Sequence, residues 1–352
     1  MTTPTLHQDS WHLMTLLDGS PGLRALGDTL ADLVDEGLPI VAGTADLKYS
    51  NGLVRFQERH PNRFTQFGIS EQNMVSAAAG MASTGLYPYV ATFASFLALL
   101  CCEQIRTDVA YTGLPVRLIG HHAGITLGFY GTSHHATEDL AIMRSIADLS
   151  VIAPADATAL AAALRATATI DQPLYFRIGR GREADVYADS GIEFELGRAI
   201  VHDRGSDITL IATGSMVAAS LEAAAALRAE GRSVGVIDMH TIKPLDAARI
   251  LDTAGSTGRL MTVEEHSVLG GLGGAVAEVL TEAGAAVPLY RHGIPDVYSL
   301  IGPPTHLYRY YGLDADGIAV RARALLDGTP VPVAAPDPDR AQLPLRHARR
   351  ER

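Results

Sequence analysis

The chain has 352 residues, about twice the length of a typical domain, which predicts two domains. Hydrophobic residues make up 47% of it and charged residues 19%, so the composition supports buried cores and excludes a disordered chain. The formal net charge of -11 argues against nucleic acid or an anionic membrane as the main partner.

Short apolar strands alternate with helical segments through the first half of the chain. Strands are predicted at 38–43, 63–67, 89–92, 116–120, 151–153 and 174–178. Helices are predicted at 23–34, from residue 52, from residue 70, at 96–110 and at 156–169. This alternation is typical of a parallel sheet that is covered by helices on both faces.

The segment 179–192 is rich in Gly, Arg and Asp, lacks periodicity and predicts a linker. Beyond it, strands are predicted at 208–212, 233–238 and 260–263, and helices at 216–229, 245–251 and 274–283. The predicted organisation is an N-terminal extension (1–20), a parallel-sheet domain (21–180), a linker (181–192), a smaller α/β domain (193–328) and a flexible tail (329–352).

The two cysteines, Cys101 and Cys102, are adjacent within an apolar segment. Adjacent cysteines do not form a disulfide in ordinary geometry, and this usage is typical of a reducing cytoplasm. The N-terminal sequence MTTPTLHQDSWHLM has no basic region followed by an apolar core, so we expect no signal peptide. The apolar stretch 87–102 is shorter than the ~20 residues of a membrane-spanning helix, so we interpret it as a buried strand and helix.

Candidate site residues gather where strands of the first domain are predicted to end. Glu71, Phe93, His122 and Arg177 each lie at or just after such an end. Ligands of open parallel sheets bind at the carboxyl ends of the strands, so we expect these residues at one edge. Glu71 follows Ser70, a predicted helix N-cap, and fits either an acid that complements the helix dipole or a buried acid that binds a cofactor.

Residues 120–136, GHHAGITLGFYGTSHHA, form a glycine-rich segment that we call the His loop. Its four histidines are His121, His122, His134 and His135. A zinc site is disfavoured because the histidine pairs are widely spaced and no acid lies between them. Loop histidines are suited to hydrogen-bonding a polar substrate and to transferring protons near neutral pH, although solvated side chains are the simpler alternative.

Phe93 and Phe96 lie three residues apart, and fit either plain core aromatics or a stacking wall for a flat heterocycle. Arg24, Ser50 and Arg177 are individually typical of surface residues or caps, but arginines at sheet ends can also bind phosphate. The turn 270–274 lacks the G-x-G-x-x-G spacing of a dinucleotide site, and therefore predicts close packing before a helix.

Taken together, these motifs resemble the carboxyl-terminal half of the transketolase family, over residues 21–326. The similar segments are Ala45-Asp46-Leu47, FGISEQNMVSAAAGMA (67–82), TFASF (92–96) with Glu103–Arg106, the His loop, Glu138–Arg144 and Val151–Asp156. The resemblance implies a pyrimidine-binding domain followed by the family's C-terminal α/β domain. Family members bind the diphosphate of thiamine diphosphate and a divalent metal through a Gly-Asp-Gly motif on a further domain, and this sequence has no such motif.

The resemblance therefore implies one half of a split transketolase, in which a partner subunit holds the diphosphate and Mg2+, Ca2+ or Mn2+. The expected assembly is an α2β2 heterotetramer. Such an enzyme transfers a two-carbon ketol unit from a ketose, expected to be phosphorylated, to an aldehyde. The alternatives are a decarboxylating relative, similar to deoxyxylulose-phosphate synthase or to the β subunit of a 2-oxo-acid dehydrogenase, and a non-catalytic scaffold or regulatory paralogue.

For the cofactor, the resemblance implies that Glu71 hydrogen-bonds the pyrimidine ring of thiamine diphosphate and activates it. Phe93 and Phe96 match the aromatic wall around that ring, and Asp46 matches an acid near the cofactor. Glu71 is therefore expected to be catalytic, and no metal ligand is expected from this chain.

For the substrate, the resemblance implies that His122 and His134 are catalytic and contact the reacting sugar. The positions expected to hold a sugar phosphate are Arg24, Ser50, His122 and Arg177. Tyr130 stands where typical members carry an acid that contacts a substrate hydroxyl. This difference predicts a bulkier or less hydroxylated substrate.

Overall fold

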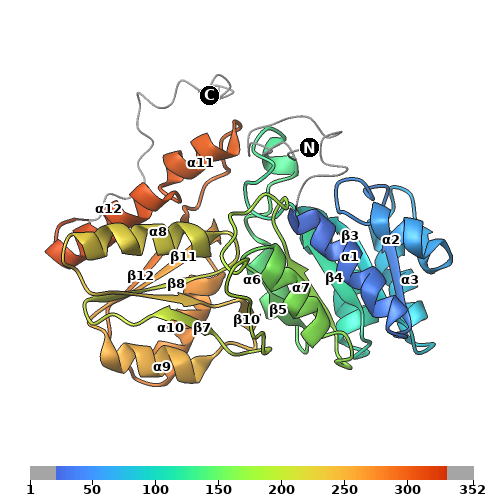
Figure 1. Ribbon diagram of the computed structural model, residues 1–352, viewed down its shortest axis with the longest axis horizontal. Coiled ribbons are helices and arrows are strands. Elements are labelled where there is room, and N and C mark those ends of the chain that lie inside the picture. The colour runs from blue at the N-terminus through green and yellow to red at the C-terminus, as the bar shows by residue number, and fades with distance from the viewer. Residues whose placement is uncertain (1–20, 331–352) are drawn as a thin grey trace, which may run out of the picture.

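The computed structural model describes residues 21–330, which form two α/β domains (Figure 1). The predicted extension 1–20 and the predicted tail 329–352, apart from residues 329 and 330, lie outside the described residues. One domain contains a seven-stranded sheet and the other a five-stranded sheet, which confirms the predicted fold class. Within residues 21–330, no helix has the length and apolar character needed to cross a membrane.

The first domain alternates strands and helices. Its strands are β1 (Ile40–Thr44), β2 (Phe64–Gln66), β3 (Tyr87–Phe93), β4 (Arg117–His121), β5 (Ser150–Ile152) and β6 (Leu174–Arg177). Its main helices are α1 (Pro21–Asp35), α2 (Val54–Arg59), α3 (Glu71–Ala82), α4 (Ala94–Leu100), α6 (Asp139–Ser145) and α7 (Ala157–Ala166). The strands run parallel in the order β5-β6-β4-β3-β1-β2, so their carboxyl ends share one edge.

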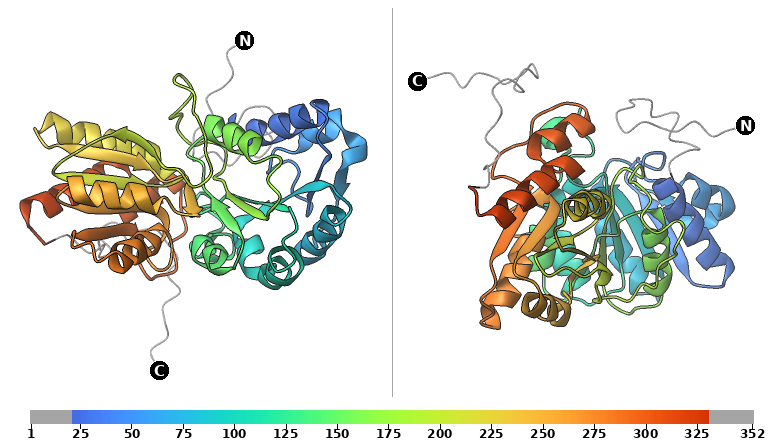
Figure 2. Two further views of the ribbon diagram at one scale, coloured as in Figure 1. Left: turned by 90° about the horizontal axis from the view of Figure 1, so that it is seen from below. Right: turned by 60° about the vertical axis from the view of Figure 1, so that its left-hand side comes forward.

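Helices cover both faces of this sheet, as the turned views also show (Figure 2). On one face, Leu26 and Leu30 of α1 are fully buried in a cluster with Ile40 and Phe56, and α7 packs beside α1. On the other face lie α3, α4 and α6. The leucines recur at helical spacing, and burying this apolar stripe against the sheet stabilises both elements.

The second domain repeats this layering with a smaller sheet. Its strands are β7 (Ile200–Asp203), β8 (Ile208–Ala212), β9 (Val234–Asp238), β11 (Leu260–Ser267) and β12 (Leu289–Ile294). Its helices are α8 (Met216–Ala229), α9 (Ala247–Ser256), α10 (Leu272–Glu282), α11 (Pro304–Tyr311) and α12 (Ala315–Asp327). The strand order is β12-β11-β8-β9-β7, with α8 and α12 on one face and α9 and α10 on the other (Figure 1).

One strand from the second half of the chain completes the first sheet. β10 (Thr241–Lys243) pairs antiparallel with β5, and Thr241 lies opposite Ile152. The Lys243 ammonium donates to the backbone oxygens of Arg144 and Ile146, at the end of α6. The second domain is therefore joined to the first by backbone pairing as well as by side chains.

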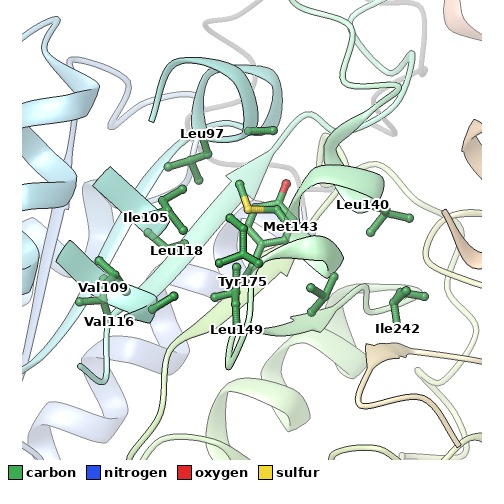
Figure 3. Close-up of a cluster of buried hydrophobic side chains, with 14 of the residues drawn as sticks. Leu97, Ile105, Val109, Val116, Leu118, Leu140, Met143, Leu149, Tyr175 and Ile242 are labelled. Carbon is green, nitrogen blue, oxygen red and sulfur yellow. The ribbon is translucent and has the colours of Figure 1, made fainter. Parts of the chain in front are cut away.

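The two domains also share one hydrophobic core. Leu118, Leu140 and Tyr175 of the first domain and Ile242 of β10 belong to a single buried cluster (Figure 3). The same cluster continues to Ile211 in the second sheet. Because apolar area buried between the domains stabilises their contact, their relative position is fixed by packing.

Some elements differ from the sequence prediction. The predicted helix 96–110 is divided into α4, α5 (Cys102–Gln104) and the π-helix η3 (Ile105–Ala110). The prediction also omits α6, α11, α12, β7, β10 and β12. The strand β10 has three residues, which are too few for an alternating pattern to be recognised.

Two local predictions have clear outcomes. Ser70 is the N-cap residue of α3, as predicted, but its side chain makes no capping hydrogen bond, because its hydroxyl donates to the Phe67 oxygen at 2.8 Å. Close packing of the turn 270–274 is confirmed, since a Cβ at Gly271 would lie 2.1 Å from Glu264 Oε2. Glu264 accepts hydrogen bonds from the N–H groups that begin α10, at 2.7 and 2.8 Å, where a nucleotide phosphate would otherwise bind.

Candidate active site

Phe93 lies at the centre of a ring cluster at the carboxyl edge of the first sheet. It is the last residue of β3, opposite His121 at the end of β4. Its ring centroid lies 4.8 Å from that of His121, 5.3 Å from that of His122 and 5.1 Å from that of His134. The parallel strands and the His loop therefore bring these predicted site residues together.

Phe96 extends this cluster from the first turn of α4. Its ring is perpendicular to that of Phe93 at 5.3 Å and lies 5.3 Å from His134. Both phenylalanines are half-buried, so each ring is partly accessible at the sheet edge. The two partly accessible rings offer a surface on which a flat heterocycle can stack. Fully buried rings would not offer such a surface.

His122 is buried at the start of the His loop. Its φ of +56° lies in the left-handed region, which is uncommon for a residue other than glycine. Its N–H donates to the Gly179 oxygen at 2.9 Å, and its Nδ1 lies 2.6 Å from Nδ1 of His121. Burial, with smaller contributions from His121 and Arg180, holds the pKa of His122 well below its usual range. His122 is therefore neutral at neutral pH, with a ring that can donate and accept hydrogen bonds.

His134 lies at the other end of the His loop, half-buried against Phe93, Phe96 and Tyr130. Its Nδ1 is 2.9 Å from the Ser133 hydroxyl, and burial lowers its pKa. The next residue, His135, is buried, and this burial lowers its pKa to about 4. His134 thus belongs to the ring cluster, while its neighbour is enclosed by the loop.

A small pocket opens beside Phe93 and His122. It is lined by Ser50, Phe93, His122, Leu127, Phe129, Tyr130 and Arg180. Arg180 is absent from the residues that the sequence predicts. Burial lowers its pKa to about 10, so the guanidinium keeps its charge at neutral pH. The signal for it is a second arginine three residues after Arg177, just beyond the end of β6.

Arg177, which is predicted to hold a sugar phosphate, makes several contacts within the protein. Its side chain is 4% exposed and its Nε donates to both oxygens of Asp139, at 3.1 and 2.9 Å. The same guanidinium donates to the backbone oxygens of Ala136, at 3.2 Å, and Glu265, at 2.8 Å. Of these contacts, only the one to Glu265 lies in the second domain, and Arg177 does not line the pocket that holds Arg180.

Glu71 is the first residue of α3, and 8% of its surface is exposed. It lies near Cys101, where burial and then the charge of Glu71 raise the pKa of that thiol to about 12. The carboxylate follows β2 at the same sheet edge but is not among the residues that line the pocket beside His122. A buried acid at this position can bind a polar group that enters from outside the chain.

Asp46 and Arg24 are exposed, unlike Glu71, His122 and Arg177. Asp46 follows β1 with a φ of +60°, and its N–H donates to the Gln66 side chain at 2.6 Å. Arg24 lies on α1, and neither residue lines the pocket beside Phe93. Among residues 21–330, no group of three or more His, Cys, Asp or Glu side chains is placed to hold a metal ion.

The two α/β units correspond to two known domains. Residues 23–183 match the transketolase pyrimidine binding domain, and residues 197–318 match the transketolase C-terminal domain. The chain therefore belongs to the transketolase family.

Single subunits of split transketolases are similar to this chain over most of their length. A subunit of the apulose-4-phosphate transketolase of Phocaeicola vulgatus is 36% identical over 299 residues, covering 85% of this chain and 95% of that protein. The 6-deoxy-6-sulfo-D-fructose transketolase subunit SqwH of a Clostridium species is 38% identical over 301 residues, with 84% and 92% covered. The solved structure of a split gene transketolase, described as an inactive beta4 tetramer, is 40% identical with a TM-score of 0.80, covering 86% of this chain and 97% of that chain.

Proposed function

We propose that this chain is one half of a two-component, thiamine-diphosphate-dependent transketolase. The assembly transfers a two-carbon ketol unit from a ketose donor to an aldehyde acceptor. The observation that carries this proposal is the gathering of Phe93, His122 and His134 at the sheet edge where Glu71 also lies. The family membership of both domains supports it.

The side chains at this edge fit the pyrimidine end of thiamine diphosphate. Glu71 offers a buried carboxylate to a ring nitrogen, and Phe93 and Phe96 offer half-buried aromatic surface to the ring. When bound, the cofactor supplies the nucleophilic carbon of the reaction. His122 and His134 are proposed to hydrogen-bond the sugar and to hold or move protons at its oxygens. Contact of Asp46 with the cofactor stays a prediction.

A partner subunit is proposed to hold the diphosphate and a divalent metal such as Mg2+, within an α2β2 heterotetramer. Large apolar side chains support a partner surface next to Glu71. Ile69 is 84% exposed, and Leu99 and Leu100 are 58% and 52% exposed. The Gln72 side chain donates to the Leu100 oxygen at 2.9 Å, so this apolar group belongs to the same region as Glu71. Such clusters are typical of surfaces that another chain covers.

Reconstitution from separate subunits tests this proposal. We expect no ketol transfer from this chain alone, and turnover after a partner subunit, thiamine diphosphate and Mg2+ are added. The measurement is formation of the new ketose from a ketose phosphate and an aldehyde, with each component alone as control. Full turnover by this chain alone would refute the two-component assignment.

The pocket beside His122 is proposed to bind the anionic end of the sugar. Arg180 provides a positive charge there at neutral pH, and Ser50 provides a hydroxyl. Two of the similar proteins are named for a sugar phosphate and for a sulfo-sugar, which both carry an anionic group. A role for the exposed Arg24 in the same binding stays a prediction.

Tyr130 is proposed to limit which sugars enter. Its ring lies 4.8 Å from that of His134 and lines the pocket with Arg180. Replacing it with Asp should shift kcat/KM toward acceptors that carry more hydroxyl groups, by about tenfold, because the carboxylate can accept hydrogen bonds that the aromatic ring cannot. The measurement compares kcat/KM over a series of hydroxylated and deoxy aldehydes. Tyr130→Phe, which keeps the ring, is the control, and an unchanged substrate profile for Tyr130→Asp would contradict this role.

A further inference from the structure

The His loop is bound to the second domain at several backbone positions. The Ile125 N–H donates to Glu265 Oε1 at 2.7 Å, and the Gly302 N–H donates to the Gly128 oxygen at 2.9 Å. The Ile125 side chain is fully buried in the hydrophobic cluster of the second domain. A loop that carries histidines of the first domain is therefore held in place from outside that domain.

Glu265 holds the loop through a carboxylate that is bonded at both oxygens. It lies on β11 with only 2% of its surface exposed. Oε1 accepts from the loop, while Oε2 accepts from the Ser215 hydroxyl at 2.6 Å, just before α8. Because both oxygens are bonded, the carboxylate has one orientation. A Cβ at Gly124 would lie 2.3 Å from Oε1, so the loop backbone approaches this carboxylate as closely as glycine allows.

The two ends of the His loop pair with each other beside Glu265. Gly124 and Ala136 exchange hydrogen bonds of 3.1 and 2.9 Å across the base of the loop. Arg177 donates to the oxygens of Ala136 and Glu265, and so joins the loop base to β11. Glu265 and Arg177 together therefore fix the segment from which His122 and His134 project.

We propose that Glu265 is a positioning residue, which holds the His loop so that His122 and His134 meet Phe93 at the sheet edge. The expected effect on catalysis rests on the proposed transketolase function, whereas the expected effect on the structure of the His loop does not. It gives the second domain a role in the active site, although Phe93 and both histidines belong to the first domain.

The adjacent Glu264 provides a matched control. It is also buried on β11, and burial raises the pKa of each of the two acids to about 7. Its carboxylate binds the start of α10 instead of the His loop. Replacement of either acid by Ala removes a buried carboxyl group from the same strand, but only one replacement removes a contact to the loop.

The test measures amide hydrogen exchange in the full chain for Glu265→Ala, Glu265→Gln and Glu264→Ala. We expect about tenfold faster exchange in the His loop for Glu265→Ala, because a buried hydrogen bond is lost. Glu265→Gln should retain most of the protection, since its amide oxygen can accept from the Ile125 N–H. Glu264→Ala should accelerate exchange at the start of α10 and leave the loop unchanged.

Kinetics of the assembled enzyme provide the second readout. Glu265→Ala should lower kcat about tenfold, and Glu265→Gln should recover most of the loss. If Glu265→Ala does not fold, Ser215→Ala removes one of the two hydroxyl groups that bond the Glu265 carboxylate, the other being that of Tyr308, and a smaller increase in loop exchange is expected. Loop protection that is unchanged in every folded variant would overturn the inference, and so would a loosened loop with normal kcat. Absence of ketol transfer in the wild-type assembly would instead overturn the proposed function, while the exchange result would stand.

Discussion

Replacement of Glu71 by Gln is expected to lower kcat of the assembled enzyme by about 10³-fold, in the range of a lost acid–base group. Glutamine keeps the size of the side chain, but it cannot share a proton with a pyrimidine nitrogen. Glu71 begins α3 and is only 8% exposed, so bulk water does not readily replace its carboxylate in sharing that proton. The measurement is steady-state ketol transfer at saturating thiamine diphosphate and Mg2+.

Two controls separate loss of catalysis from loss of assembly. Glu103→Gln makes the same chemical change on an exposed acid. Among the ion pairs of the described residues, Glu103 pairs only with Arg106, so this variant should leave kcat near the wild-type value. Sedimentation should show that the Glu71 variant still assembles with its partner. Normal turnover by an assembled Glu71→Gln enzyme would remove Glu71 from the catalytic residues.

Replacement of His134 by Ala is expected to lower kcat/KM by about 100-fold. The imidazole lies against Phe93 and Tyr130, with ring centroids 5.1 and 4.8 Å away, and the substitution removes the ring nitrogens that are proposed to contact the sugar. His134→Gln should recover part of the loss if hydrogen bonding contributes, and none if proton transfer accounts for the whole effect. Initial rates over a range of donor concentrations measure both constants.

His135 is the control for this prediction, because the same substitution is made one residue further along the loop. Its side chain is buried and its pKa is lowered to about 4, so it is neutral and enclosed. His135→Ala should lower the melting temperature, since a buried ring is removed, while the folded enzyme retains most of its kcat. Equal losses of kcat/KM for both variants would show that the loop, and not His134 itself, is required.

The sequence pattern is sufficient for the layered α/β fold and for much of the site. Apolar strands alternating with helices predict parallel sheets, and parallel sheets place strand ends at one edge. This reasoning places Phe93 and His122 at one edge, and their ring contact agrees with it, whereas His134 enters the site only through the loop and the family resemblance. The family resemblance adds the roles of these residues, which periodicity alone does not supply.

The two arginines show what the sequence pattern could not resolve. Arg177 lies at a strand end, as a phosphate-binding residue should, yet its guanidinium is occupied by Asp139 and by the Glu265 backbone oxygen. Arg180 follows the strand and lines the pocket. The spacing of residues along the chain does not show which of the two nearby arginines contacts a buried acid that belongs to a different helix or strand. The contacts of Glu265 were missed for the same reason, because its partner Ile125 is 140 residues away.

The antiparallel pairing of β10 with β5 also affects how the protein is made. As a nascent chain leaves the ribosome, β5 and β6 are synthesised well before Thr241–Lys243. Until β10 arrives, the outer edge of β5 has unpaired backbone groups, and such an edge can pair with a strand of another molecule. Synthesis of the second domain thus covers the β5 edge of the first sheet, so that this edge is no longer open to pairing with a strand of another molecule.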